Sequence, residues 1–157
     1  MIKRLTLFVI RSLLLFMTVA AVAHADAIRP GDTPVLPVLT TLDGKTINPA
    51  SLRGKVLVIS YFASYCPFCA NEAPKLQKLY SKNTDKLIVI GVNIETKDPQ
   101  QKEKAQQWVR KYQLTHPVTT DFPALERALG KRQGLPVNYV FDLSLIHISE
   151  PTRQAEI

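Results

Sequence analysis

The sequence has few of the side chains that build structural metal sites. Its 157 residues include two cysteines, Cys66 and Cys69, and three histidines. His24 and His147 lie near the two ends of the chain, in segments that we interpret below as a leader and a tail, so His116 stands alone in the body of the chain. Because a structural zinc site needs four ligands, a zinc site built on the two cysteines is disfavoured.

The sequence also lacks any dense run of lysine or arginine. The formal net charge is +7, and Lys3, Arg4 and Arg11 contribute three of these charges from the leader. A basic patch or stripe is the electrostatic feature of a nucleic-acid-binding domain, so we expect no nucleic-acid partner. The remaining mild excess favours acidic partners only weakly. The length predicts a single domain.

The first apolar stretch is too short to span a bilayer, which takes about 20 residues, because Arg11 interrupts it. Residues 1–25 instead have the pattern of a secretory signal peptide, with Lys3 and Arg4 before a short apolar stretch and Ala23-His24-Ala25 as a cleavage site. The alternative is an uncleaved membrane anchor. Either interpretation places the domain outside the cytoplasm, in the periplasm or an equivalent compartment. There a dithiol can be held oxidised, and it needs a partner, such as a membrane electron donor, to be reduced.

The two cysteines are separated by two residues and follow a continuous apolar run, Val56–Phe62, which is typical of a buried strand. Apolar residues after Cys69 recur at helical spacing, so the dithiol lies where a strand ends and a helix begins. The free N–H groups and the positive dipole end at a helix start favour a thiolate, the species that attacks disulfides. We therefore expect Cys66 to attack and Cys69 to resolve. An inert disulfide would close a very small loop and constrain the unfolded chain little.

The segment Tyr65-Cys66-Pro67-Phe68-Cys69, followed by Glu72 and Pro74, resembles the thioredoxin superfamily. It is most similar to the TlpA/ResA-like extracytoplasmic thiol-disulfide oxidoreductases, although Tyr65 stands where that family usually has Trp. The resemblance implies an α/β thioredoxin-like fold with a central mixed sheet, flanking helices and an N-terminal hairpin. It also implies disulfide exchange with envelope proteins, as a reductant and with cytochrome c maturation as one candidate role. No organic cofactor or metal is implied, because the electrons reside in the dithiol.

A second part of the resemblance lies downstream, where Pro136 precedes an alternating strand, Val137–Phe141. The superfamily has a cis-proline at this place, packed against the dithiol. A cis Leu135–Pro136 bond would expose the Leu135 backbone to pair with an extended substrate. The expected substrate-binding residues are Tyr65, Pro67, Phe68, Leu135 and Pro136.

Three further side chains have competing interpretations. Glu72 lies three residues after Cys69 and shares its helix face. Because Ser60 occupies the strand position where thioredoxin carries a buried Asp, Glu72 is the nearest candidate to move a proton to or from Cys69; the alternative is an ordinary solvated glutamate. His116 is expected to be exposed and incidental, and Trp108 to be a core residue of a helix.

The principal alternative function is that of a non-enzymatic copper-handling chaperone of similar fold, since two thiolates can hold Cu(I). Such proteins usually add a third ligand, often His, and space their cysteines by three residues. The spacing of Cys66 and Cys69 and the position of His116 favour thiol–disulfide exchange instead.

The end of the chain does not have the character of a natural protein sequence. Leu143–Arg153 matches the conceptual translation of a sequencing-library transposon adapter. We therefore predict that residues 143–157 are an artefact and that the thioredoxin-like domain, residues 26–142, lacks its final strand and helix. Val137–Phe141 would then be an unpaired sheet edge, and unpaired edges invite aggregation.

Overall fold

The computed structural model describes residues 27–149, so the predicted signal peptide and the end of the predicted tail lie outside the described residues. In chain order the elements are β1 (Leu39–Thr40), β2 (Thr46–Ile47), the short 3-10 helix η1 (Pro49–Leu52), β3 (Val56–Phe62), α2 (Pro67–Lys82), β4 (Leu87–Asn93), α3 (Gln101–Lys111), β5 (Val118–Thr119), α4 (Phe122–Leu129), β6 (Val137–Phe141) and β7 (His147–Ser149). Within this described part of the chain, no helix is long and apolar enough to cross a membrane.

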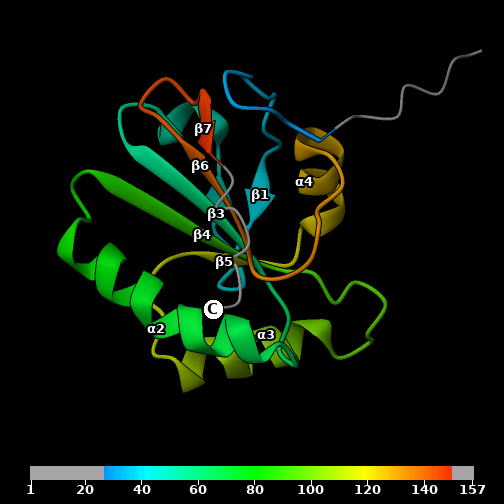
Figure 1. Ribbon diagram of the computed structural model, residues 1–157. Helices are drawn as coiled ribbons and strands as arrows, with labels where there is room; N and C mark the ends of the chain where they lie inside the picture. The colour runs from blue at the N-terminus through cyan, green and yellow to red at the C-terminus, as the bar shows by residue number, and fades with distance from the viewer. Residues whose placement is uncertain (1–26, 150–157) are drawn as a thin grey trace, which may run out of the picture.

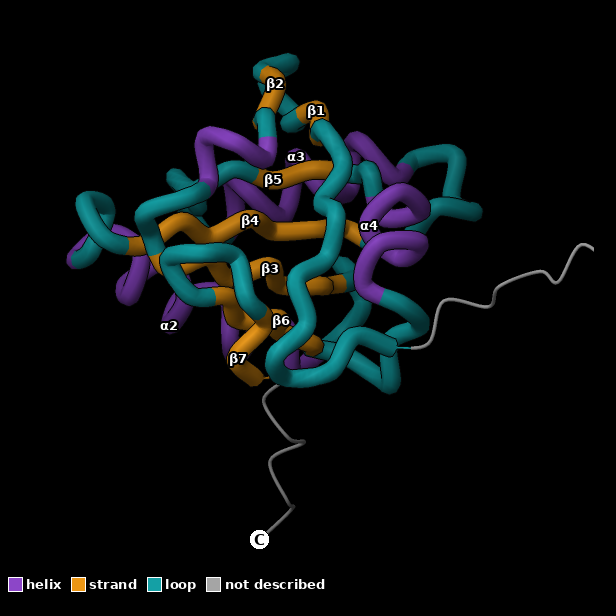
Figure 2. The backbone as a smooth tube through the Cα atoms, turned by 90° about the horizontal axis from the view of Figure 1, so that it is seen from above, coloured by secondary structure: helices purple, strands orange, loops and turns teal. Residues whose placement is uncertain are grey.

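Five strands form one mixed sheet in the order β5-β4-β3-β6-β7, and β1 pairs with β2 in a separate antiparallel hairpin. β3, β4 and β5 run parallel, whereas β6 is antiparallel to β3 and β7 is antiparallel to β6. α2 and α3 cover one face of the sheet, and α4 lies with the N-terminal segment on the other (Figure 1, Figure 2). The predicted thioredoxin-like architecture, a mixed sheet flanked by helices with an N-terminal hairpin, is confirmed.

The central strand β3 supplies side chains to both halves of the core, because successive residues of a strand point to opposite faces. Tyr61 points toward α4, where its ring meets that of Phe122 edge-on with centroids 5.4 Å apart. Phe62 points toward the other helices and stacks on Trp108 at 5.0 Å. Trp108 is 5% exposed, so its predicted place in the core is confirmed. Ser60 shares the face of Phe62 and therefore places a polar group beneath the helix that follows the dithiol.

The prediction that β6 is an unpaired edge strand is wrong. β7 pairs antiparallel with β6 and supplies the final strand that was expected to be missing. Asp142 turns the chain back, because its carboxylate accepts hydrogen bonds from the backbone N–H groups of Ser144 and Ile146 at 2.8 and 2.9 Å. Residues 150–157 lie outside the described residues, so the predicted absence of a final helix stays a prediction. The adapter origin of this segment stays a prediction.

Two features of β7 and the turn before it are energetically unfavourable. His147 is 1% exposed and packs against the rings of Tyr139 and Phe141, and neither of its ring nitrogens has a hydrogen-bond partner among the residues that the structure describes. A buried polar group without a partner costs about 1–3 kcal/mol. Leu145 has φ +66°, a left-handed conformation that costs a residue with a side chain about 1–3 kcal/mol. Both features lower the stability that the pairing of β7 with β6 provides.

Replacement of His147 by leucine should stabilise the folded protein. An apolar side chain keeps the packing against Tyr139 and Phe141 and removes two buried nitrogens, so we expect the free energy of unfolding to rise by about 1–2 kcal/mol. Chemical denaturation followed by circular dichroism measures this change. The neighbouring substitution Ile148→Leu, at an exposed position, should have no effect. A less stable His147→Leu variant would mean that the imidazole makes a favourable interaction.

Candidate active site

The dithiol lies where β3 leads into α2. Cys66 is the N-cap residue of α2, with φ −87° and ψ 113°, and its Sγ accepts a hydrogen bond from the backbone N–H of Cys69 at 3.2 Å. Pro67 follows in the first turn, where a backbone N–H would have no partner within the helix, so its missing N–H costs no helical hydrogen bond. Both cysteines are free, and they are 8% and 2% exposed. Cys66 therefore stands at the helix start, as predicted.

Cys69 lies one turn further along the helix and is enclosed by the core. Burial, followed by the hydrogen bond with Cys66, raises the pKa of the Cys69 thiol to about 12. The nearby negative charge of Glu72 acts in the same direction. At neutral pH Cys69 therefore keeps its proton, and it must give that proton to a base before it can attack a disulfide at Cys66.

Glu72 is not an ordinary solvated glutamate. Its side chain lines the same cavity as Cys69 and Ser60, and its Oε1 accepts a hydrogen bond from Nδ2 of Asn138 in β6 at 2.6 Å. Burial raises the pKa of the Glu72 carboxyl above its usual range, while the hydrogen bond from Asn138 and the charge of Lys75 oppose the rise. A half-buried carboxylate with raised proton affinity is thus held close to the buried thiol.

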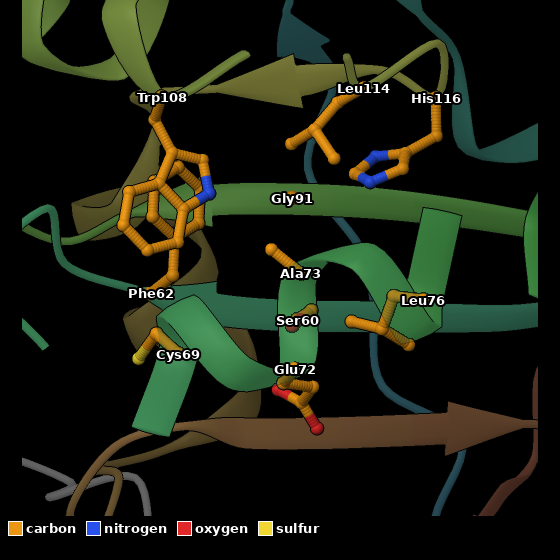
Figure 3. Close-up of a pocket in the computed structure, with 10 residues that line it drawn as sticks. All are labelled: Ser60, Phe62, Cys69, Glu72, Ala73, Leu76, Gly91, Trp108, Leu114 and His116. Carbon is orange, nitrogen blue, oxygen red and sulfur yellow. The ribbon is translucent and has the colours of Figure 1, made fainter. Parts of the chain in front are cut away.

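A cavity of about 20 Å³ lies beneath the first turns of α2. Figure 3 shows Cys69 and Glu72 on α2, Ser60 on β3, and the stacked rings of Phe62 and Trp108 at one end of the space. A space of this size admits about one water molecule. Side chains of both Cys69 and Glu72 therefore line the same small cavity.

His116 lines the cavity from the side of β5, so the expectation that it is exposed and incidental is wrong (Figure 3). It is 6% exposed, and its ring meets that of Tyr80 edge-on with centroids 5.8 Å apart. Burial lowers the pKa of the imidazole. Gly91 makes room for the ring, since a Cβ there would lie 3.3 Å from Cε1 of His116. This packing joins segments distant in the chain, and the local pattern around His116 does not encode it.

The loop before β6 brings the second predicted part of the site to the same end of the sheet. The Leu135–Pro136 peptide bond is cis, as predicted. Val137, the next residue, is the register partner of Tyr61 in β3. Pro136 therefore lies near the C-terminal end of β3, and Cys66 follows that end of the strand in the chain. Leu135 is partly buried and packs against the core cluster that includes both cysteines.

Aromatic side chains beside the cysteines remain in solvent. Tyr65 is 72% exposed and Phe68 is 65% exposed, and Pro67 between them is exposed as well. The residues predicted to bind substrate are thus brought to one end of the sheet, around Cys66.

Local sequence patterns did not identify Glu95, which fixes the loop before the attacking cysteine. Its Oε2 accepts a hydrogen bond from the backbone N–H of Ser64 at 2.7 Å, and its Oε1 accepts one from the Ser64 hydroxyl at 2.8 Å. Asn93 donates a third bond to Oε2 at 2.7 Å. One sequence signal could have indicated this contact. Glu95 and Ser64 each follow an apolar strand, and the carboxyl ends of the parallel strands β4 and β3 meet at one edge of the sheet.

The cysteine pair has no further metal ligands gathered around it. Among residues 27–149 there is no group of three or more His, Cys, Asp or Glu side chains that could hold a metal ion. His116 shares the cavity with Cys69 but does not complete such a group with the cysteines.

Truncation of Glu95 should loosen the loop that presents Cys66. The Glu95→Ala variant loses three hydrogen bonds to a carboxylate, so we expect the free energy of unfolding to fall by about 2 kcal/mol and the reduction of a disulfide substrate to slow. Denaturation and steady-state reduction assays measure the two effects. Glu103→Ala, a matched change at an exposed position of α3, should alter neither. Parent-like stability and rate in Glu95→Ala would remove this role from Glu95.

Comparison with known sequences agrees with this geometry. The family model described as Redoxin matches residues 24–142. The thioredoxin-like protein YneN of Bacillus subtilis is 26% identical over 120 residues, which cover 74% of this chain and 69% of that protein. The thiol-disulfide oxidoreductase ResA of Halalkalibacterium halodurans is 31% identical over 100 residues, which cover 63% of this chain and 54% of that protein. The chain thus spans about half the length of the ResA relative.

Solved structures show the same fold. A thiol:disulfide interchange protein of the thioredoxin family from Chlorobium tepidum has a TM-score of 0.65 and 27% identity, and the match covers 78% of this chain and 86% of that chain. A secreted Mycobacterium tuberculosis disulfide oxidoreductase, described as homologous to Escherichia coli DsbE, has a TM-score of 0.63 and 24% identity over 77% of this chain and 87% of that chain. The predicted relationship to ResA-like members of the thioredoxin superfamily is confirmed, and the chain belongs to the Redoxin family.

Proposed function

We propose that the protein is a thiol–disulfide oxidoreductase that exchanges disulfides with protein partners through Cys66 and Cys69. The observation that carries this proposal is the asymmetry of the two thiols. Cys66 caps the start of α2, whereas Cys69 is buried behind it with a raised pKa and a carboxylate nearby. One thiol is placed to attack and the other to be activated by a base. The names of relatives, among them thiol-disulfide oxidoreductases, support the same activity.

The reaction consists of two exchanges. The Cys66 thiolate attacks a partner disulfide, forms a mixed disulfide and releases one partner thiolate, which takes up a proton. Glu72 then accepts the proton of Cys69, and the Cys69 thiolate attacks the sulfur of Cys66. The mixed disulfide breaks, the Cys66–Cys69 disulfide forms, and the second partner thiolate leaves. The partner gains two electrons and the dithiol loses two.

Partner proteins dock around Cys66 in this proposal. Tyr65 and Phe68 offer exposed aromatic surface on either side of the attacking sulfur, and Pro67 lies between them. The backbone of Leu135, ahead of Pro136, would pair with an extended segment of the partner, as the resemblance to the thioredoxin superfamily implies. The partner would therefore present its disulfide in an unfolded or extended stretch.

We place this activity outside the cytoplasm, with residues 1–25 as the secretory signal. One structural neighbour is named as a secreted protein, which supports this assignment. The resemblance to ResA-like proteins favours a reductant that a membrane electron donor re-reduces, and apocytochrome c is one candidate partner. In this compartment an oxidised dithiol would not be reduced again without such a donor.

The Cys69→Ser variant should accumulate mixed disulfides with partner proteins. Without the resolving thiol, the bond between Cys66 and its partner has no intramolecular path to break. Mass spectrometry of adducts formed in periplasmic or extracellular extracts, with and without reductant, measures the accumulation. Cys66→Ser is the control and should form no adducts. Adducts on Cys66→Ser and none on Cys69→Ser would reverse the two roles.

The Glu72→Gln variant should slow the resolving step about 100-fold. The pKa of the Glu72 carboxyl is raised by burial, so the base form is lost as the pH falls through a value above the usual carboxyl range. The parent protein should therefore slow across that interval, whereas Glu72→Gln should be slow throughout and lose this pH dependence. Rapid-mixing kinetics of a preformed mixed disulfide measures the profile. Glu103→Gln, at an exposed position of α3, should keep the parent profile, and the same result for Glu72→Gln would leave Glu72 without a part in proton transfer.

A further inference from the structure

Asn138 lies opposite Ser60 in the register between β3 and β6, on the face of the sheet that α2 covers. Its side chain is 8% exposed, and its Nδ2 donates a hydrogen bond to Oε1 of Glu72 at 2.6 Å. The Glu72 side chain points toward β6 in Figure 3. The other polar atom of the carboxamide, Oδ1, is buried and has no hydrogen-bond partner within residues 27–149. A buried acceptor is thus kept next to a carboxyl group.

A carboxamide can serve both protonation states of a carboxyl group. Its NH₂ donates, its carbonyl oxygen accepts, and a half-turn about the Cβ–Cγ bond exchanges the positions of the two atoms. An ionised Glu72 only accepts hydrogen bonds, so Nδ2 suits it. A protonated Glu72 has an O–H to donate, and Oδ1 suits that state. The unpaired Oδ1 is therefore the acceptor that the acid form of Glu72 needs.

We propose that Asn138 is a positioning residue for proton transfer, whose carboxamide holds Glu72 at the cavity in both of its protonation states. In the resting dithiol, Nδ2 donates to the carboxylate. When Glu72 takes the proton of Cys69, the carboxamide turns, and Oδ1 accepts the new O–H. The part that this plays in disulfide exchange rests on the proposed function, but the change of hydrogen bond requires only that Glu72 be protonated.

Several other titratable or charged groups lie near Glu72. Cys69 and Lys75 lie on α2 itself, and His116 lies just ahead of β5. β3, β4, α3 and β6 contribute uncharged side chains to this region. The lowered pKa of the His116 imidazole brings its titration closer to that of Glu72. An activity profile alone would mix the two events, so the test has to observe Glu72 and Asn138 directly.

Nuclear magnetic resonance of the reduced protein provides that test. The ¹³C carboxyl signal of Glu72, assigned with Glu72→Gln, gives its titration midpoint, and the side-chain ¹H–¹⁵N signals of Asn138, assigned with Asn138→Leu, are followed in the same pH series. We expect the Asn138 signals to shift with the midpoint of Glu72 and not with that of His116. Asn138 signals that stay constant through the Glu72 titration overturn the proposal.

The Asn138→Leu variant keeps the volume and removes both polar atoms. The bond from Nδ2 to the carboxylate is charge-assisted and therefore stronger than the bond from the acid's O–H to Oδ1, so the loss of both should raise the Glu72 midpoint by up to about one pH unit. Val140→Ala is the matched control, two residues along the same strand and on the same face. It should lower stability and leave the Glu72 midpoint unchanged.

Each outcome decides a separate point. A parent-like Glu72 midpoint in Asn138→Leu overturns the proposal, and so does an equal shift in Val140→Ala, which would show a general effect of packing. If Asn138→Leu does not fold, the amide titration of the unmodified protein decides. If the midpoint and amide signals behave as expected but the protein exchanges no disulfides, the proposed function fails and the inference about Asn138 stands.

Discussion

The candidate site depends on the packing of the first turns of α2 against the end of β3. At the N-cap position, Sγ of Cys66 accepts a hydrogen bond from the backbone N–H of Cys69. Cys69 lies one turn further along α2, and its side chain is buried in the core. The same packing half-buries Glu72, so burial raises the pKa of the thiol and that of the carboxyl together. Cys66 at the helix start and Cys69 one turn further in thus occupy different places in the helix, although both side chains are buried.

Much of this arrangement could be predicted from local sequence patterns. The apolar run Val56–Phe62 indicated the buried strand, and the cysteine pair marked the junction with the helix. Alternation along Val137–Phe141 indicated the strand that follows Pro136. These predictions succeeded because each depends on residues within one turn or one strand. The cis bond at Pro136 was available only through the resemblance to the thioredoxin superfamily.

The features that local patterns missed all depend on contacts between distant segments. His116 is buried because the register of β4 and β5 sets it against Gly91, and Glu95 reaches Ser64 only because two strand ends meet. β7 pairs because a sheet edge offers backbone groups to almost any extended segment. The ring nitrogens of His147 have no hydrogen-bond partner among residues 27–149, so backbone pairing alone does not satisfy every polar group of this strand.

The reduction potential of the Cys66/Cys69 couple tests the central claim most directly. It can be measured by equilibration with glutathione or dithiothreitol redox buffers and quantification of the free thiols. A reductant with a buried, protonated resolving thiol should show a reversible two-electron couple more negative than about −200 mV, on the side of thioredoxin at about −270 mV. A potential near the −120 mV of a strong oxidant such as DsbA, or the absence of a reversible couple, would contradict the account.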